Sequence, residues 1–288
     1  TTSSMLAEAL LECGLDPTVH IGGRLDALGG GSRVGGKDFF VAEACEFHGS
    51  FWEMHPTLAV VLNIDADHLD FYGDMAHIEA GFFRFLQLLP PDGVALGWGE
   101  DARIMGLFDR LDRRRVTFGM TDKCDYFPCN LSYSDTGCPR FDVALNGRIL
   151  AHVTMQVAGS FNVLNALAAF AAAHLSGADA QDIAASLSRF KGVHRRFELT
   201  GIIDGVKMYH DYGHNPTEMR AALSVARQQR PGRLWAVMQP HTFSRVKSLF
   251  DDYLTCTREA DFTLVTDIFA AREKDPGDIR SEMLVEGM

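Results

Sequence analysis

Long hydrophobic stretches are absent from this sequence of 288 residues, and so are Cys-x-x-Cys pairs and long runs of basic residues. No run approaches the roughly 18 to 20 apolar residues that a transmembrane helix needs. No basic segment followed by an apolar one opens the chain, as it would in a secretory leader. We therefore expect a soluble, cytoplasmic protein without membrane insertion.

The six cysteines are scattered, and no two of them form a Cys-x-x-Cys pair. This spacing argues against a zinc ribbon and against the disulfide framework of a small secreted protein. We expect reduced thiols that serve mainly in packing. Their positions are Cys13, Cys45, Cys124, Cys129, Cys138 and Cys256.

Basic residues are outnumbered: the chain has 27 Lys and Arg against 38 Asp and Glu, a net charge of -11. Neutralising the phosphates of a nucleic acid requires clustered Lys and Arg. We therefore expect no nucleic-acid partner. Solubility alone explains the excess of acidic residues.

The sequence has enough apolar side chains, 47% of its residues, for more than one core, so two domains are expected. Short apolar runs at 39–44, 59–63 and 94–96 have the pattern of strands, and 78–89 has the pattern of a helix. Alternation of strands and helices predicts an α/β fold with a mostly parallel sheet.

Between residues 126 and 157 this alternation gives way to a pattern typical of antiparallel strands. Asn146-Gly147 separates two strand-like runs at 141–145 and 149–155, which predicts a hairpin. An Ala-rich helix is expected at 162–176, ending at Gly177, and a second one at 179–189. The first domain should therefore combine a parallel sheet with a small antiparallel part.

An α/β rhythm resumes at Gly205, with strands expected at 206–210, 234–238 and 262–266. Helices are expected from Thr217 and from Ser244. We place the domain boundary near Phe197, which gives domains at 1–197 and 198–288.

Acidic residues follow two of the predicted strands. Glu43-Ala44-Cys45-Glu46 ends one of them, and Asn-Ile-Asp-Ala-Asp-His-Leu-Asp at 63–70 ends another. Carboxyl ends of parallel strands share one sheet edge, where carboxylates could hold Mg²⁺ together with water and phosphates. The alternative is that these residues only cap the helices that follow.

Two asparagines open the Ala-rich helix. Asn162 is expected to be its N-cap, and Asn165 lies one turn later on nearly the same face. Paired amides can bind the hydrogen-bonding edge of a base. Capping alone would explain Asn162, but it would not explain the second amide.

Three polar segments follow in the second half of the chain. Arg195 and Arg196 lie at the expected domain boundary, and such a fork binds phosphate or carboxylate, unless it is only a solvated linker. The segments 209–218 and 239–245 each follow an apolar strand. We expect these two strands to be neighbours that direct polar residues the same way, although polar turns with satisfied hydrogen bonds would have the same pattern.

These segments, in this order and spacing between residues 43 and 273, resemble the Mur ligase family and, within it, the branch that adds L-alanine. The resemblance rests on seven motifs in combination: Glu-Ala-x-Glu, Asn-Ile-x-Ala-Asp-His-Leu-Asp, Gly-x-x-Asn-x-x-Asn-Ala, Gly-x-x-Arg-Arg-Phe-Glu, Asp-Tyr-Gly-His-x-Pro-Thr-Glu, Gln-Pro-His and Ala-Ala-Arg-Glu.

The resemblance implies a central ATPase domain followed by an incomplete Rossmann-like domain for the amino acid. The family's N-terminal sugar-binding domain and Gly-rich phosphate loop would precede Thr1, and its last elements would follow Met288. On this basis the chain is expected to be a fragment that is inactive by itself.

The implied cofactors are ATP and Mg²⁺, and the implied substrates are UDP-N-acetylmuramic acid and L-alanine. ATP would phosphorylate the sugar's carboxylate, and the amine of L-alanine would attack the acyl phosphate. By motif position, Glu43 and His68 match the family's catalytic magnesium ligands. Asn162 and Asn165 match its nucleotide-contacting asparagines.

The remaining matches lie at and after the expected boundary. Arg196 and Asp211 match catalytic residues that contact phosphate and nucleotide. Tyr212, His214 and Arg245 match positions near the reacting carboxylate and the amino acid, and His214 is also a catalytic candidate.

Departures from the family pattern lie beside these positions. Thr242 stands where many members have Arg, which puts part of the substrate-orienting contact in doubt. Phe82-Phe83 stands where several sister ligases carry a modified lysine, and this fits the L-alanine branch.

The alternatives are another ligase of the superfamily, such as a murein-tripeptide or folate-polyglutamate ligase, and a non-catalytic nucleotide-binding remnant. The oligomeric state is left open.

Overall fold

The computed structural model describes the backbone of all 288 residues and every side chain except that of Asp70. The chain divides into two compact units, Thr1–Ser134 with Cys138–His194, and Arg195–Met288 with Asp135–Gly137. Among the described residues, none of the helices has both the length and the apolar character that crossing a membrane requires. The assignment of ATP and amino-acid binding to these units stays a prediction.

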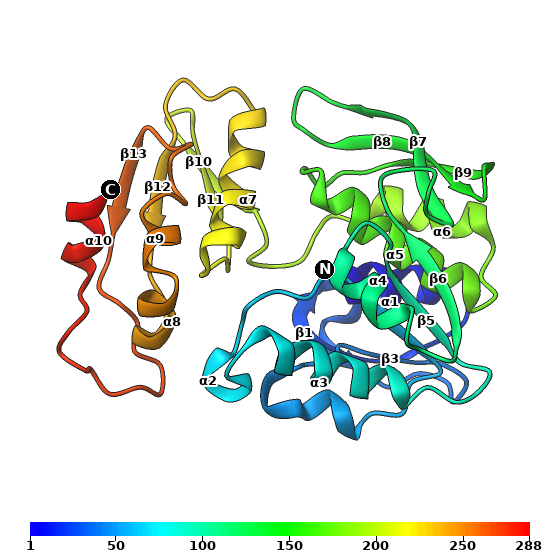
Figure 1. The fold of residues 1–288 in the computed structure, drawn as a ribbon. Helices are drawn as coiled ribbons and strands as arrows, with labels where there is room; N and C mark the ends of the chain where they lie inside the picture. Colours follow the sequence, from blue (N-terminus) through cyan, green and yellow to red (C-terminus); the bar gives the residue numbers. More distant parts are fainter. The chain divides into compact units, whose positions relative to one another are not determined.

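A six-stranded sheet forms the centre of the first unit (Figure 1). Its first four strands in order pair in parallel, and its last three pair antiparallel. The predicted mixture of a parallel sheet and a small antiparallel part is therefore confirmed. The strands, in spatial order, are β4 (Leu58–Val61), β5 (Val94–Trp98), β6 (Arg114–Phe118), β7 (Tyr126–Tyr133), β8 (Pro139–Leu145) and β9 (Arg148–Thr154).

The predicted hairpin joins β8 to β9 through Asn146 and Gly147. These residues have φ angles of 49° and 82°, both in the left-handed region. Two successive left-handed residues match the twist of an antiparallel pair, and Asn-Gly is the dipeptide that adopts them at least cost.

Helices cover both faces of this sheet, because its central strands bury side chains in both directions. In β5, Leu96 belongs to the first of two hydrophobic clusters and Ala95 to the second. The first cluster lies against α1 (Thr2–Glu12), α5 (Phe161–Leu175) and α6 (Ala180–Arg189). The second lies against α3 (Met75–Gln87) and α4 (Ala102–Phe108).

A separate three-stranded sheet in the order β2-β1-β3 lies in the same unit. Strand β3 (Phe40–Ala42) pairs in parallel with β1 (Thr18–Leu25), which pairs antiparallel with β2 (Gly30–Arg33). The expectation that the strands before Glu43 and Asn63 share one sheet is therefore wrong. Strand β1 contains Gly22-Gly23, which lowers the strand signal, so the partner of β3 was not recognised in the sequence.

Short helical elements lie between these strands and helices. The 3₁₀ segments η1 (Asp26–Leu28) and η2 (Phe47–Glu53) follow β1 and β3, and α2 (Leu69–Tyr72) precedes α3.

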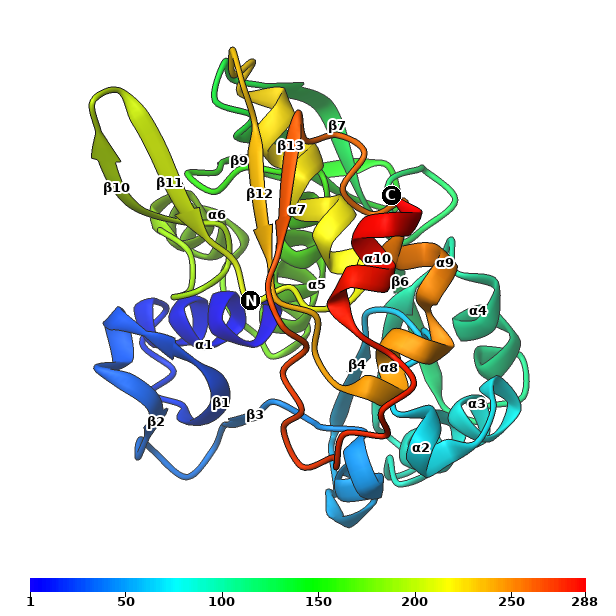
Figure 2. The same cartoon turned by 90° about the vertical axis from the view of Figure 1, so that its left-hand side faces the viewer.

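The second unit contains two ladders of two strands each, drawn as separate ribbons in Figure 2. Strands β10 (Glu198–Ile203) and β11 (Val206–His210) are antiparallel, and β12 (Trp235–Met238) and β13 (Phe262–Val265) are parallel. The expectation that β11 and β12 are neighbouring strands of one sheet is therefore wrong. Strand β11 pairs instead with β10, a segment to which the sequence analysis had assigned no strand.

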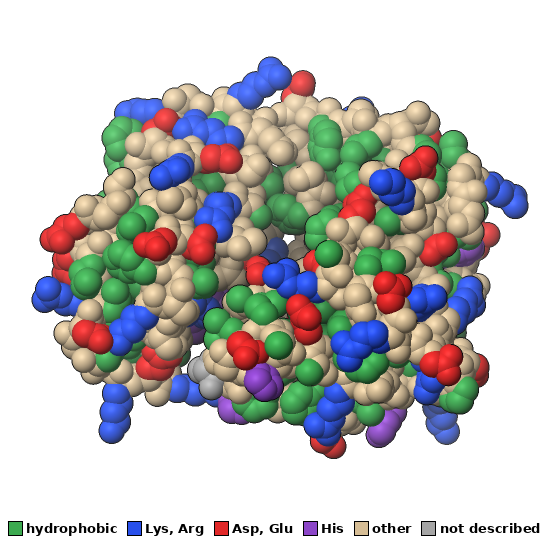
Figure 3. Space-filling view, in the orientation of Figure 1, with side chains coloured by type: hydrophobic (Ala, Val, Ile, Leu, Met, Phe, Trp, Pro, Cys, Tyr) green, Lys and Arg blue, Asp and Glu red, His purple; other side chains and the backbone are tan. Residues whose placement is uncertain are grey.

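Helices of the second unit pack a small core against β12. Met219, Met238, Val246 and Tyr253 lie in this core and are buried. The helices, two of which begin as predicted near Thr217 and Ser244, are α7 (Pro216–Gln228), α8 (Phe243–Ser248), α9 (Phe250–Tyr253) and α10 (Ser281–Gly287). On the face drawn in Figure 3, acidic and basic side chains are interspersed, with hydrophobic side chains between them.

Candidate active site

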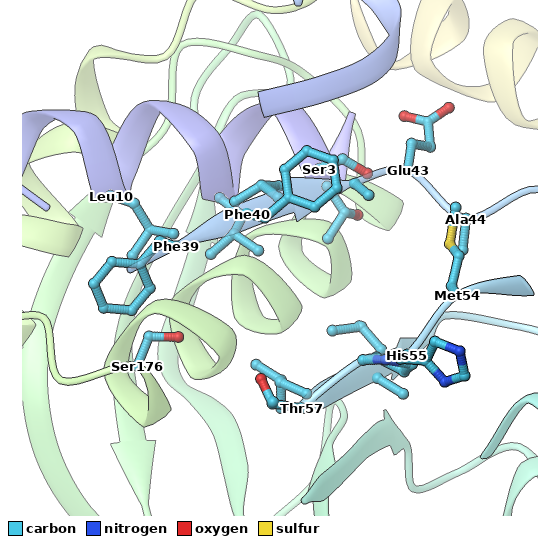
Figure 4. Close-up of a pocket in the computed structure, with 18 of the residues that line it drawn as sticks. Ser3, Leu10, Phe39, Phe40, Glu43, Ala44, Met54, His55, Thr57 and Ser176 are labelled. Atoms are coloured by element: carbon cyan, nitrogen blue, oxygen red, sulfur yellow. The ribbon is translucent and has the colours of Figure 1, made fainter. Parts of the chain in front are cut away.

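A cavity of about 860 Å³ lies in the first unit, between the terminal strands β3 and β4 of its two sheets. The start of α1 also lines it. Figure 4 shows Leu10, Phe39 and Ser176 at one side of the cavity and Glu43 and His55 at the other. One side is therefore mainly apolar, whereas the other carries groups that can bind a polar ligand.

Glu43 follows β3 and is exposed. Its backbone N–H donates to His20 O over 2.9 Å, which continues the pairing of β3 with β1. Its carboxylate lies against Gly22, where an added Cβ would be 2.9 Å from Glu43 Oε1. Gly22 thus leaves room for the predicted metal-binding carboxylate.

His68 is paired with Glu46: its Nε2 lies 3.5 Å from Glu46 Oε1. The hydrogen bond from His68 holds the pKa of Glu46 below its usual range, although burial acts in the opposite direction. The ring of Phe47 also packs against His68, with its centroid 4.6 Å from that of the imidazole. Glu46 belongs to the same Glu-Ala-x-Glu motif as Glu43. The sequence analysis did not select it as a site residue, although the motif contains it.

The fit of these residues to a metal ion can be judged from their number and type. Among the described side chains, no group of three or more His, Cys, Asp or Glu is placed to hold an ion. Mg²⁺ needs no such group, because it keeps several waters and binds through one or two carboxylates plus substrate phosphates. The donors present fit Mg²⁺ bound with phosphate, and the approach of Glu43 to His68 stays a prediction.

Asn162 is not the N-cap of α5, so this prediction is wrong. The cap is Ser160, and Asn162 lies in the first turn with only 7% of its surface exposed. Its Nδ2 donates to Ala158 O over 2.7 Å and therefore binds the loop before the helix. The helix begins one residue earlier than expected because Gly159, with a φ of 105°, redirects the chain before it.

Asn165 continues this hydrogen-bonded chain. Its Nδ2 donates to Asn162 Oδ1 over 3.0 Å, and its Oδ1 accepts from Thr2 Oγ1 over 2.9 Å. The two amides thus connect the start of α1 to the start of α5, which gives the second asparagine a structural role. Their predicted contact with a nucleotide stays a prediction.

The second unit brings together four of the predicted residues. The guanidinium of Arg196 lies 5.8 Å from the centroid of the Tyr212 ring, and that ring is 5.4 Å from the ring of His214. The ring of His214 lies 5.0 Å from that of His241, to which Arg245 is bonded. Two cations and two imidazoles therefore form one cluster.

The tautomer of His214 follows from its bond to the backbone. Its Nδ1 lies 3.0 Å from Tyr212 O, and a carbonyl oxygen can only accept. Nδ1 therefore carries a proton, and in the neutral ring Nε2 has a lone pair. The carbonyl of His214 accepts from the hydroxyl of Tyr253 over 2.6 Å, and burial raises the pKa of Tyr253 to about 12, so this donor stays protonated.

His241 has the opposite tautomer. Arg245 Nη1 lies 3.0 Å from His241 Nδ1, and a guanidinium can only donate. Nδ1 is therefore the acceptor, and the proton of the ring is on Nε2. The sequence analysis quoted His241 in Gln-Pro-His but did not select it.

Thr242 adopts a φ of 64°, which is unusual for a β-branched residue. Its N–H donates to Phe269 O over 2.9 Å, and its Oγ1 accepts from the N–H of Arg245 over 3.4 Å. This strained residue at the start of α8 therefore helps to fix the backbone that carries Arg245.

Asp211 binds backbone N–H groups. Its Oδ2 accepts from Phe197 over 2.8 Å and its Oδ1 from Gly213 over 2.6 Å. Arg195 and Phe197 have φ angles of 62° and 48°, so the carboxylate stabilises a segment with left-handed residues. The contact of Asp211 with a nucleotide stays a prediction, and so does the common cleft predicted for Asn162 and Arg196, which belong to different units.

Comparison with known proteins places both units in one family. Residues 1–173 match the Mur ligase middle domain, and residues 195–288 match the Mur ligase, glutamate ligase domain. The chain is 40% identical over 287 residues to the UDP-N-acetylmuramate--L-alanine ligase of Acetivibrio thermocellus. This alignment covers 99% of this chain and 61% of that protein. It is 41% identical over 284 residues to the ligase of the same name from Clostridium botulinum strain Langeland, of which it covers 62%.

Solved structures agree with this assignment. The UDP-N-acetylmuramate-alanine ligase of Thermotoga maritima superposes with a TM-score of 0.80 at 27% identity, over 100% of this chain and 61% of that one. A murein peptide ligase from Psychrobacter arcticus superposes with a TM-score of 0.71 at 26% identity, over 92% of this chain and 60% of that one. The chain thus spans about three fifths of the length of the relatives it matches. Since both of its units match domains of the same enzymes, the chain belongs to the Mur ligase family.

Proposed function

We propose that this chain contributes the ATP-binding and amino-acid-binding parts of a ligase that joins L-alanine to UDP-N-acetylmuramic acid in peptidoglycan precursor synthesis. The observation that carries this proposal is the 40% identity, over 99% of the chain, to ligases of that name. The cluster around His214 and Arg245 supports it, because it gathers groups suited to anionic substrates.

The chemistry begins with a carboxylate, which is a poor electrophile. Transfer of the γ-phosphoryl group of ATP to the sugar's carboxylate would give an acyl phosphate. The amine of L-alanine would attack its carbonyl carbon, and the tetrahedral intermediate would expel phosphate to leave the amide. Phosphoryl transfer depends mostly on positioning and on neutralising negative charge.

Residues of the second unit are suited to these needs. Arg196 would bind phosphate oxygens, and Arg245 with His241 would bind a carboxylate. His214 would accept the proton that the attacking amine must lose, because its Nδ1–H is held by Tyr212 O and its Nε2 has the lone pair.

Residues of the first unit would bind the nucleotide. Asn162 and Asn165 would contact it, and Glu43 and His68 would hold Mg²⁺ together with phosphate oxygens. When bound, Mg²⁺ supplies charge neutralisation at the transferred phosphoryl group.

The test is phosphate release with UDP-N-acetylmuramic acid, ATP, Mg²⁺ and L-alanine. It is run on a longer polypeptide that joins this chain to the sugar-binding and C-terminal parts of a relative, and on the 288-residue chain alone. We expect release that depends on L-alanine from the longer polypeptide, and the family resemblance predicts none from the chain alone.

Two results would contradict the proposal. Turnover that is indifferent to L-alanine would refute the amino-acid assignment. Turnover only when the tripeptide L-alanyl-γ-D-glutamyl-meso-diaminopimelate replaces L-alanine would favour a murein peptide ligase, with which the structure also superposes.

A further inference from the structure

Glu218 lies in the first turn of α7 and takes part in its capping. Its N–H donates to Asn215 Oδ1 over 2.9 Å, and its Oε2 accepts from the N–H of Asn215 over 3.4 Å. This reciprocal capping box stabilises the start of the helix, and glutamine serves in it as well as glutamate. Capping alone therefore does not require the negative charge of Glu218.

The same carboxylate also faces two predicted site residues, which capping does not require. Glu218 Oε1 lies 3.7 Å from Arg196 Nη1. Glu218 Oε2 accepts from the backbone N–H of His214 over 3.0 Å and lies 3.7 Å from His214 Nδ1. One carboxylate thus joins the segment that carries Arg196 to the segment that carries His214.

We propose that Glu218 is a positioning residue, which holds the guanidinium of Arg196 and the backbone of His214 in the geometry that ligation uses. The catalytic consequence rests on the function proposed above, whereas the positioning itself does not. Arg196 is exposed and has many rotamers, so a nearby charge is needed to select one of them. By fixing the N–H of His214, Glu218 also keeps Nδ1–H directed to Tyr212 O, which leaves Nε2 as the acceptor.

The contacts of Arg245 provide a comparison within the same cluster. Arg245 is held by His241, through the bond from Nη1 to Nδ1, and also donates to His241 O over 3.4 Å. Neither of these bonds involves Glu218. A change at Glu218 should therefore affect Arg196 and leave Arg245 in place.

The first experiment uses the 288-residue chain and the substitution Glu218→Gln, which keeps a capping side chain and removes the charge. Side-chain ¹⁵Nε–¹Hε relaxation by NMR measures the order of each arginine. We expect the order parameter of Arg196 to fall in the variant while that of Arg245 stays unchanged. Glu282→Gln, which removes a charge from the first turn of α10, is the matched control and should change neither.

The second experiment measures kcat/KM for L-alanine in the longer polypeptide. We expect Glu218→Gln to lower it by about tenfold, the lower end of the range for residues that orient a functional group. In an Arg196→Ala background the same substitution should lower kcat/KM by a much smaller factor, because part of the effect of Glu218 depends on the Arg196 side chain. A merely structural residue would lower activity by the same factor in both backgrounds.

The two experiments separate the possible failures. An Arg196 order parameter that is unchanged by Glu218→Gln would overturn the positioning role, and so would an equal loss of kcat/KM in both backgrounds. A longer polypeptide that shows the NMR effect but no release of phosphate with L-alanine would retain the positioning role and overturn the proposed function instead.

Discussion

Replacing Asp211 by alanine should destabilise the second unit strongly, even without any ligand. The carboxylate accepts two backbone N–H groups, from Phe197 over 2.8 Å and from Gly213 over 2.6 Å. It thereby joins the residues before β10 to those after β11. Arg195 and Phe197 have left-handed φ angles, and such strain persists only where surrounding contacts hold it.

The size of the effect can be worked out from these two bonds. A hydrogen bond to a charged group contributes about 1.5–3 kcal/mol to stability, and two would contribute about 3–6 kcal/mol. Phe197, Asp211 and Gly213 are all only partly buried, so water replaces part of what is lost. We expect Asp211→Ala to lower the free energy of unfolding of the second unit by about 2–4 kcal/mol. Asp211→Asn, which keeps one acceptor oxygen, should cost about half as much.

Tryptophan fluorescence during urea denaturation can measure this change. The chain has three tryptophans, and Trp235 belongs to the second unit, where its ring stacks on Phe262 at a centroid distance of 4.3 Å. Variants made in a background with Trp52→Phe and Trp98→Phe report on that unit alone.

Asp267→Ala is the control, because it removes an exposed carboxylate from the same unit. We expect it to change the free energy of unfolding by less than about 0.5 kcal/mol. A change equally small for Asp211→Ala would refute the reasoning, because it would mean that the two N–H groups find other partners at no cost.

Three further outcomes are expected. Gly147→Ala should destabilise the first unit by about 1–2 kcal/mol in urea denaturation, because alanine is strained at a φ of 82°. Asn165→Ala should lower the free energy of unfolding by roughly 1–3 kcal/mol in the same assay, because it leaves Thr2 Oγ1 without this acceptor. Burial raises the pKa of Tyr126 and of Tyr253 to about 12, so the folded state keeps protons that the unfolded state loses near pH 10. The free energy of unfolding should therefore be unaffected by these groups below pH 10 and should fall by roughly 2–3 kcal/mol per tyrosine as the pH rises to 12. Absorbance at 295 nm would follow the ionisation, and urea denaturation at each pH would follow the stability.

Local features of the fold could be predicted because their causes are local. The Asn146-Gly147 turn, the Ala-rich helix ending before Gly177 and the alternating strands of the first unit were recognised from a few neighbouring residues each. The family could be identified for the same reason, since its motifs are short and their order along the chain is unaffected by folding.

Strand partners could not be predicted in the same way. β3 pairs with β1, and β11 pairs with β10, and in both cases the partner lay in a segment that the sequence pattern did not identify as a strand. A single strand carries no information about which edge it meets, because backbone hydrogen bonds are the same for every residue type except proline.

The sequence by itself determined which segments carry the polar candidate residues, through motifs that contain Glu43, His68, His214 and Arg245. Only the tertiary structure decided which atoms meet. It paired His68 with Glu46, directed the amide of Asn162 to a loop carbonyl, and placed Glu218 beside Arg196. Such contacts depend on differences of about an ångström between segments far apart in the chain, and the packing of whole elements fixes those differences.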